Sequence, residues 1–260
     1  MSASVTTQVG FVARRSVRRT FRQPAVLVPT IVFPLFLLAV NASGLSSATN
    51  LPGFPGDSYL DFAIVVTFMQ GALFAATTAG TELATDIESG FLSRLQLTPL
   101  RGVSILVGQL AGAVAVALMG AVTYLVIGLI AGVTIVTGVG GALVLLALAT
   151  LIGVAFGSIG AFFAARTGSS QAVQGLFPLL FVTFFLSSIN LPRELIEIDW
   201  FRAVASANPV SYLVEGMRSL VITGWDATAL LRGFGVAVAV AVVGFGAAAS
   251  SLRTRMARTG

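Results

Sequence analysis

The stretch VSILVGQLAGAVAVALMGAVTYLVIGLIAG, residues 103–132, runs for thirty residues without a charged side chain. About twenty apolar residues are enough for an α-helix to cross the hydrocarbon core of a bilayer. Of the 260 residues in the chain, 56% are hydrophobic and 10% are charged, and the mean hydropathy is +0.96. Soluble domains carry about 25% charged residues. These values predict an all-α integral membrane protein.

Five further apolar stretches predict a single membrane domain, residues 1–260, with six transmembrane helices. The predicted spans are residues 25–43, 59–80, 103–132, 138–165, 172–191 and 233–252. Small residues recur four apart in the fourth span, as at Gly153 and Gly157, and in the third, at Gly108 and Gly112. This spacing lets helix backbones approach closely in lipid.

The residue types that are missing exclude several kinds of chemistry. The chain contains no His, no Cys and no Lys. It therefore cannot form a His-ligated or thiolate metal site, a His-dependent nucleophile or the lysine of a phosphate-binding loop. We expect no metal site, no bound cofactor and no ATPase activity of its own. The arginines lie beside apolar runs, which is typical of membrane orientation rather than nucleic-acid binding.

The first 24 residues hold five arginines and no acidic residue. These arginines are Arg14, Arg15, Arg18, Arg19 and Arg22. On a helical wheel they share one arc. The opposite arc consists of Val9, Val12, Ala13, Val17 and Phe21. The pattern predicts an amphipathic helix on the cytoplasmic surface of the membrane. Alternatively, these arginines serve only to orient the first span.

Arginines are distributed unequally across the predicted topology. Most lie in the N-terminal segment, the 82–101 loop, the 166–171 turn and the tail, which share one side. The other side holds Arg193, Arg202, Arg218 and Arg232. Because arginine-rich segments stay in the cytoplasm, we expect a multi-pass protein of the cell membrane with both termini cytoplasmic. The use of Arg alone, with abundant Ala, Val and Gly, is typical of a bacterium with a high G+C content, such as an actinobacterium.

Residues 82–101 form a predicted cytoplasmic loop with an apolar edge flanked by charges. As a helix over about residues 89–97, this loop would present an edge suited to docking into a groove on another protein. The residues of the edge are Glu88, Phe91, Leu92, Arg94 and Leu95. The alternative is a solvated loop with a turn at Pro99.

Ionisable side chains are rare inside the predicted spans. Asp61 and Glu82 lie at opposite ends of the second span and Arg166 ends the fourth, where each is expected to reach the interface. A proton-driven carrier normally needs a titratable group near the middle of the bilayer. The energy for transport is therefore expected to come from outside the chain, unless the protein is a passive channel. Candidates for a substrate path are Phe177, Phe181 and Phe184, with packing or lipid contact as the alternative.

Residues 192–232 are too polar for a span and too apolar for an ordinary loop. We expect short helices over residues 193–204 and 209–222, the second with Asn208 as N-cap and Pro209 at its first position. They predict a re-entrant hairpin on the outer side between the fifth and sixth spans, or alternatively a surface cap. Glu215 and Arg218 lie three apart and are expected to pair on one helix face.

Two strings resemble one known family. Residues 88–101, ESGFLSRLQLTPLR, look like the cytoplasmic loop of ABC transporter permeases of the ABC-2 type. Residues 208–218, NPVSYLVEGMR, resemble the signature that precedes the last span in that family. The branch that the chain resembles most is the bacterial drug-resistance exporters of the daunorubicin type. Lipid-linked polysaccharide exporters and nodulation-factor exporters share the layout, so the motifs do not identify a substrate.

The resemblance implies a permease subunit of an ATP-driven exporter for a drug, an antibiotic or a lipid-like molecule. Two permeases, identical or homologous, would sit on two copies of a separate ATPase that binds ATP and Mg. The ATPase contacts it implies are Glu88, Phe91, Leu92, Arg94 and Leu95, supported by Arg14, Arg15, Arg18 and Arg19. The outer gate it implies consists of Asn208, Pro209, Tyr212, Glu215 and Arg218. The alternative is a secondary carrier or channel that works without an ATPase.

Overall fold

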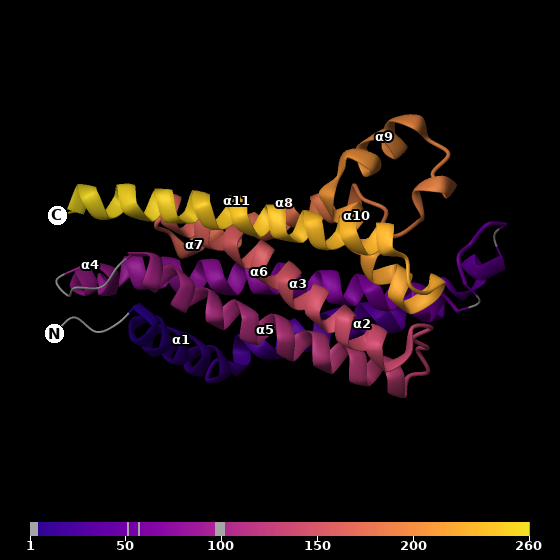
Figure 1. The fold of residues 1–260 in the computed structure, drawn as a ribbon, viewed down its shortest axis with the longest axis horizontal. Helices are drawn as coiled ribbons and strands as arrows, with labels where there is room; N and C mark the ends of the chain where they lie inside the picture. The colour runs from indigo at the N-terminus through magenta and orange to yellow at the C-terminus, as the bar shows by residue number, and fades with distance from the viewer. Residues whose placement is uncertain (1–4, 51, 57, 97–101, 260) are drawn as a thin grey trace.

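The structure, a computed structural model, describes residues 5–50, 52–56, 58–96 and 102–259. All regular elements within these ranges are helical. Five of the described helices are long and apolar enough to span a membrane: α2 (Pro24–Gly44), α3 (Tyr59–Glu88), α5 (Gly102–Ile130), α6 (Gly138–Thr167) and α11 (Ala227–Thr259). They run along the long axis of the molecule (Figure 1). The expectation of an all-α membrane-spanning protein is confirmed.

Shorter elements lie at the two ends of this bundle. One end, here called the basal end, holds α1 (Val5–Phe21), α4 (Phe91–Gln96) and α7 (Ser170–Gln174), which leads into α8 (Leu176–Phe185). The other, distal end holds the 3-10 helices η1 (Ser46–Asn50) and η2 (Arg193–Leu195) and the projecting α9 (Asp199–Ala207) (Figure 1). Then come α10 (Pro209–Arg218) and the π-helical turn η3 (Ser219–Thr223) before α11.

Helix α3 occupies the centre of the bundle. In the most apolar 18-residue stretch of α3, 83% of the residues are buried, whereas in the corresponding stretch of α2 only 17% are buried. It packs against α2, α5 and α6, and its buried side chains include Phe62, Phe68, Met69 and Leu73. Large apolar side chains on α2, α5 and α11 stay exposed, as expected for helices whose solvent is lipid. A displacement of α3 would therefore change its packing against α2, α5 and α6.

Glycines set the closest helix crossings. Gly160 of α6 lies against Ala76 and Gly80 of α3, where an added Cβ would overlap the Ala76 carbonyl group. The predicted small residues Gly153 and Gly157 also lie at a crossing, where they approach alanines of α5 most closely and alanines of α3 less closely. Two faces of α6 thus approach two different helices, and the sequence spacing identified one of them.

The predicted fifth span, residues 172–191, differs most from the expectation. Its apolar helical segment is short and is interrupted at Gly175, between α7 and α8, and the helix ends at Phe185. The amide of Asn208 donates hydrogen bonds to the carbonyl oxygens of Thr183 (2.7 Å) and Leu186 (3.0 Å). These bonds satisfy acceptors that a longer helix would have used itself. A sixth crossing therefore remains a prediction.

The ends of other helices also differ from the predicted ends of the spans. Helix α3 continues to Glu88, eight residues past the predicted end of the second span, and α11 begins at Ala227 rather than at 233. The predicted 82–101 loop is correspondingly shorter. Helix α10 packs against α3, α6 and α11, and Gly216 of α10 lies against Gly233 of α11. The second half of the predicted hairpin is thus enclosed by protein, whereas its re-entrant position in a membrane remains a prediction.

Candidate functional site

Helix α1 packs against the first half of α5 at the basal end. Gly108 and Gly112 of α5 make room for it, since an added Cβ would overlap Val12 at the first and Ser16 at the second. The buried residues of α1 are Gln8, Val12, Ser16 and Thr20. Of the predicted apolar arc, Val12 is buried but Phe21 is 52% exposed. The helix prediction is correct, but the buried face differs from the apolar arc.

This face carries hydroxyl groups because it meets the carboxylate of Glu82 on α3. Ser16 Oγ donates to Glu82 Oε2 and Thr20 Oγ1 donates to Glu82 Oε1, both at 2.8 Å. Glu82 is only 4% exposed, so the expectation that it reaches the interface is wrong. The reason is that α3 continues beyond Glu82 and α1 covers it. A buried carboxylate without such donors would be strongly destabilising.

One turn further along α3, Asp86 joins the same contact. Arg15 donates to both of its carboxylate oxygens (2.7 and 2.9 Å), Arg19 donates to one (2.9 Å), and Gln109 of α5 donates to the other. The hydrogen bond to Asp86 raises the pKa of the Arg15 guanidinium, which therefore stays charged. The α1–α3 cluster, as we name it, consists of Arg15, Ser16, Arg19, Thr20, Glu82, Asp86 and Gln109.

Helix α4 touches this cluster through Phe91. The guanidinium carbon of Arg15 lies 4.0 Å from the centre of the Phe91 ring, within the range of a cation–π contact. Of the other predicted docking residues on α4, Arg94 is exposed, while the side chain of Leu95 lies outside the described residues. Leu92 is 4% exposed and belongs to an internal apolar cluster. Leu92 therefore holds α4 in place and presents no surface to another chain, contrary to the expectation.

Glu88 also has a different setting from the one expected. It is the last residue of α3, and its carboxylate accepts hydrogen bonds from the backbone N–H (2.7 Å) and the hydroxyl of Ser170 at the start of α7. Its charge is exposed but engaged within the chain. The end of α3 is thereby joined to α7.

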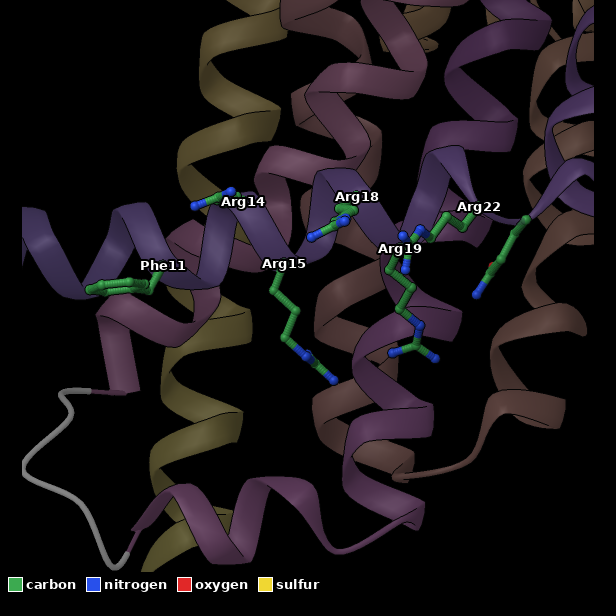
Figure 2. A pocket seen from close by; sticks show the side chains of 7 residues that line it. Phe11, Arg14, Arg15, Arg18, Arg19 and Arg22 are labelled. Atoms are coloured by element: carbon green, nitrogen blue, oxygen red, sulfur yellow. The ribbon is translucent and has the colours of Figure 1, made fainter.

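The arginines of α1 divide into two sets. Figure 2 shows Arg15 and Arg19 extending from one edge of the helix, while Arg14 and Arg18 lie on another side. The first two are held by Asp86. Within the part of the chain that the structure describes, no carboxylate pairs with Arg14 or Arg18. A groove of about 610 Å³ runs along these side chains and is lined by Phe11, Arg14, Arg15, Arg18, Arg19, Arg22 and Gln23.

A second groove, of about 490 Å³, lies between α2 and α3 at the basal end and reaches α7. Val26 and Pro29 of α2 and Phe74 of α3 give it apolar walls. Its polar lining from α3 consists of Thr77, Thr78, Thr81, Glu82 and Thr85. A groove with these two kinds of lining suits an amphipathic molecule.

Phe74 connects the second groove to a row of aromatic rings. Its ring centre lies 6.2 Å from that of Phe33 on α2 and 5.7 Å from that of Phe177 on α8. Phe181 and Phe185 continue the row along α8 at 5.9 and 4.8 Å. We name these five residues the aromatic row. Two of the three predicted path residues, Phe177 and Phe181, belong to it.

Phe184, the third predicted path residue, lies elsewhere. It is 2% exposed and packs edge-on against Phe156 of α6, with ring centres 5.5 Å apart. The positions four apart on α8 share one face, and Phe184 is turned away from that face into the core. It is a packing residue.

At the distal end, the start of α10 is as predicted. Asn208 Oδ1 accepts a hydrogen bond from the N–H of Val210 (2.9 Å), and Pro209 occupies the first helical turn. The hydroxyl of Tyr212 donates to the carbonyl of Ser206 in α9 (2.7 Å). These contacts fix the angle between α9 and α10.

The predicted pair of Glu215 and Arg218 is wrong. Glu215 forms its ion pair with Arg193 of η2. Arg218 is 6% exposed and donates to the carbonyl oxygens of Ser188 (3.1 Å) and Ile189 (3.0 Å) just beyond α8. The two side chains share α10 but reach different neighbours, because η2 and the end of α8 lie beside different parts of that helix. Arg218 therefore fixes the end of α8, together with Asn208.

Comparison with known families identifies the chain. A family model described as ABC-2 type transporter matches residues 7–222, from α1 to η3. This chain belongs to the ABC-2 type transporter family. It is therefore the membrane component of an ABC transporter, and ABC-2 membrane domains generally act with ABC ATPases. No curated protein matches the chain.

The polar partners in the α1–α3 cluster of this ABC-2 type transporter were not found from the sequence. Ser16 and Thr20 lie four apart on α1, and Glu82 and Asp86 lie four apart on α3. Residues four apart share a helix face. Two polar stripes of matching length could therefore have predicted that α1 packs against this end of α3. Gln109, in contrast, stands alone in an apolar helix and its partner is seen only in the fold.

Proposed function

We propose that this chain is the permease subunit of an ATP-driven exporter in the bacterial cell membrane. Two copies, or this chain and a homologue, act with two copies of a separate ATPase that holds ATP and Mg. The cargo is a hydrophobic or amphipathic molecule such as a drug, an antibiotic or a lipid-like compound. The α1–α3 cluster is the observation that carries the proposal, because it fixes a basic, exposed helix to the central helix of the bundle.

The cluster supports coupling to an ATPase for a mechanical reason. Both contacts of α1 with α3 are made by buried carboxylates, and Arg15 extends the contact to Phe91 of α4. A partner that pushes on α1 or α4 would therefore displace α3. For such a push to change the conformation, the ATPase must contact the two states of the permease with different free energies. Sites that accept such contact are Arg94 and Phe91 of α4 and the edge of α1 that carries Arg15.

The second groove and the aromatic row support the cargo class. Hydroxyl groups and a carboxylate line the basal part of the groove, while the row from Phe33 through Phe74 to Phe185 continues with apolar rings. A molecule with a polar end and an apolar body would match this order of linings. Resemblance to daunorubicin-type exporters supports the same class and an outward direction.

The proposed orientation places the basal end in the cytoplasm, and cysteine labelling tests it. The native chain has no Cys, so single cysteines can replace Ser47 and Ser206 at the distal end and Ser89 and Thr254 at the basal end. In intact cells a membrane-impermeant maleimide should label only the distal pair. The basal pair should react after permeabilisation. Labelling of Ser89→Cys in intact cells would reverse the orientation.

The proposed ATPase surface can be tested by co-purification from native membranes. The double variant Phe91→Asp with Arg94→Glu should retain about tenfold less ABC ATPase than wild type, because a docking edge tolerates mismatched charge poorly. The measurement is the ratio of ATPase to permease peptides by quantitative mass spectrometry. The matched control, Trp200→Asp with Arg202→Glu, makes the corresponding aromatic-to-Asp and Arg-to-Glu changes on exposed α9 and should retain the wild-type ratio.

Two results would contradict this proposal. One is the absence of any ABC ATPase from the wild-type preparation, or equal retention by both double variants. The other is substrate flux at the full rate in proteoliposomes that contain this chain and no ATPase, which would assign the protein to the secondary carriers or channels.

A further inference from the structure

We infer that the exposed side of α1 is a binding site for the headgroups of anionic phospholipids, formed by Arg14, Arg18 and Arg22. These three residues follow one another at intervals of four and all are exposed. Side chains at this interval lie on neighbouring turns of one helix side. Because Asp86 engages Arg15 and Arg19 instead, the three form a separate positive stripe along the groove of about 610 Å³ (Figure 2).

The charge of this stripe is not balanced by any carboxylate in the part of the chain that the structure describes. Helix α1 contains no acidic residue. Among the described residues, no carboxylate pairs with any of the three arginines. Guanidinium groups bind phosphate through two parallel hydrogen bonds, so a row of three presents repeated sites for phosphodiester groups. Phe11, 70% exposed at one end of the groove, offers an apolar contact for the glycerol and first methylene groups of a lipid.

The position of the stripe selects lipid rather than a soluble anion. Arg22 precedes by two residues Pro24, the start of the membrane-spanning α2. Helix α2 is long and apolar enough to span the membrane, so its first turn lies near one membrane surface. Arg22 consequently lies close to the level at which the hydrocarbon begins, which is where phosphate groups are found. Phe21, adjacent in sequence and 52% exposed, places an apolar ring at the same level.

The same position favours lipid over an ATPase as the occupant. The docking edge proposed above lies on α4 and on the Arg15 edge of α1, through the contact with Phe91. Arg14 and Arg18 lie on another side of α1 (Figure 2). The stripe binds lipid whether or not an ATPase binds α4.

The experiment uses the full-length protein purified in a zwitterionic detergent. Phosphatidylglycerol or phosphatidylcholine is added, and bound lipid is counted by native mass spectrometry. Wild type should bind phosphatidylglycerol in preference to phosphatidylcholine, and the preference should fall as salt is raised. In the variant Arg14→Gln, Arg18→Gln, Arg22→Gln, the ratio of phosphatidylglycerol to phosphatidylcholine affinity should fall by on the order of 100-fold. Each arginine near the membrane surface contributes somewhat less than a factor of about ten to this ratio.

The matched control removes the same charge elsewhere. Arg166, Arg232 and Arg253 are exposed on α6 and α11, and their triple Gln variant should keep the wild-type preference. Equal loss in both variants would mean that net charge alone attracts the lipid and would overturn the site. Inorganic phosphate at matched concentration should not displace phosphatidylglycerol, and full displacement would overturn the assignment to lipid.

A further measurement distinguishes a lipid-binding site from a protein-docking surface. The stripe variant should retain the ATPase subunit in the co-purification assay and keep the wild-type melting temperature in phosphatidylcholine. Loss of the ATPase with unchanged binding of phosphatidylglycerol would show that the stripe docks a protein and would overturn the inference.

Discussion

Replacing Asp86 by Asn should lower the free energy of unfolding by about 3 kcal/mol, the lower end of the range for breaking a buried ion pair. The Asp86 side chain is 4% exposed and receives Arg15, Arg19 and Gln109. An amide can accept from one or two of these donors but offers no negative charge to the two arginines. Its own N–H donors would also face the guanidinium groups. Helix α1 should consequently be held to α3 more weakly, through Glu82 alone.

This effect can be measured by titrating the protein in mixed micelles with a denaturing detergent. A matched control is Asp199→Asn, since the Asp199 side chain is 96% exposed and its pair with Arg202 is a surface pair. Such pairs contribute about 0–1 kcal/mol. If Asp86→Asn and Asp199→Asn unfold at the same detergent fraction, the α1–α3 cluster does not hold α1, and the proposed route from an ATPase to α3 is lost.

Replacing Gly160 by Ala should be more damaging still and should prevent stable folding. Overpacking a core typically costs about 1–3 kcal/mol, because side chains can rotate away from the added group. Here the added methyl would overlap the backbone carbonyl group of Ala76, which has no rotamer to change. The central helix α3 and α6 would have to separate along much of their length.

The control for this variant is Gly246→Ala in α11, where an added Cβ meets nothing within 4 Å. It should be neutral or stabilise the helix by up to about 1 kcal/mol, the propensity difference between Gly and Ala. Expression level and elution as a single species in size-exclusion chromatography give the comparison. A Gly160→Ala protein that elutes and unfolds like Gly246→Ala would show that α3 and α6 do not touch at this point.

The features predicted correctly are those that a local cause determines. Lipid imposes a minimum length on any apolar helix that crosses it, so five of the six predicted spans reappear as long apolar helices. The start of α10 was also predicted, because an Asn-Pro pair fixes a helix start by itself. Neither feature depends on a residue far away in the chain.

The features that were missed depend on distant residues. Glu82 was expected at an interface because it follows an apolar run, and Asp86 lay in the predicted 82–101 loop, but residues more than sixty positions away in α1 bury both. The spacing of Glu215 and Arg218 predicts a pair in an isolated helix. In the fold, Arg193 and the end of α8 provide closer partners. Hydropathy likewise cannot show that Asn208 and Arg218 bind the carbonyl groups at which α8 ends.

The hydrogen bonds between Glu88 and Ser170 have a consequence for how motion would spread under the proposed function. Ser170 opens α7, which passes through Gly175 directly into α8 and the rings of Phe177 and Phe181. A shift in the last turn of α3 would thus tilt α8 at the moment it displaces α4. The hydrogen bonds between Glu88 and Ser170 would thus couple the ATPase to the aromatic row directly at the basal end. No rearrangement along the whole length of the bundle would be needed.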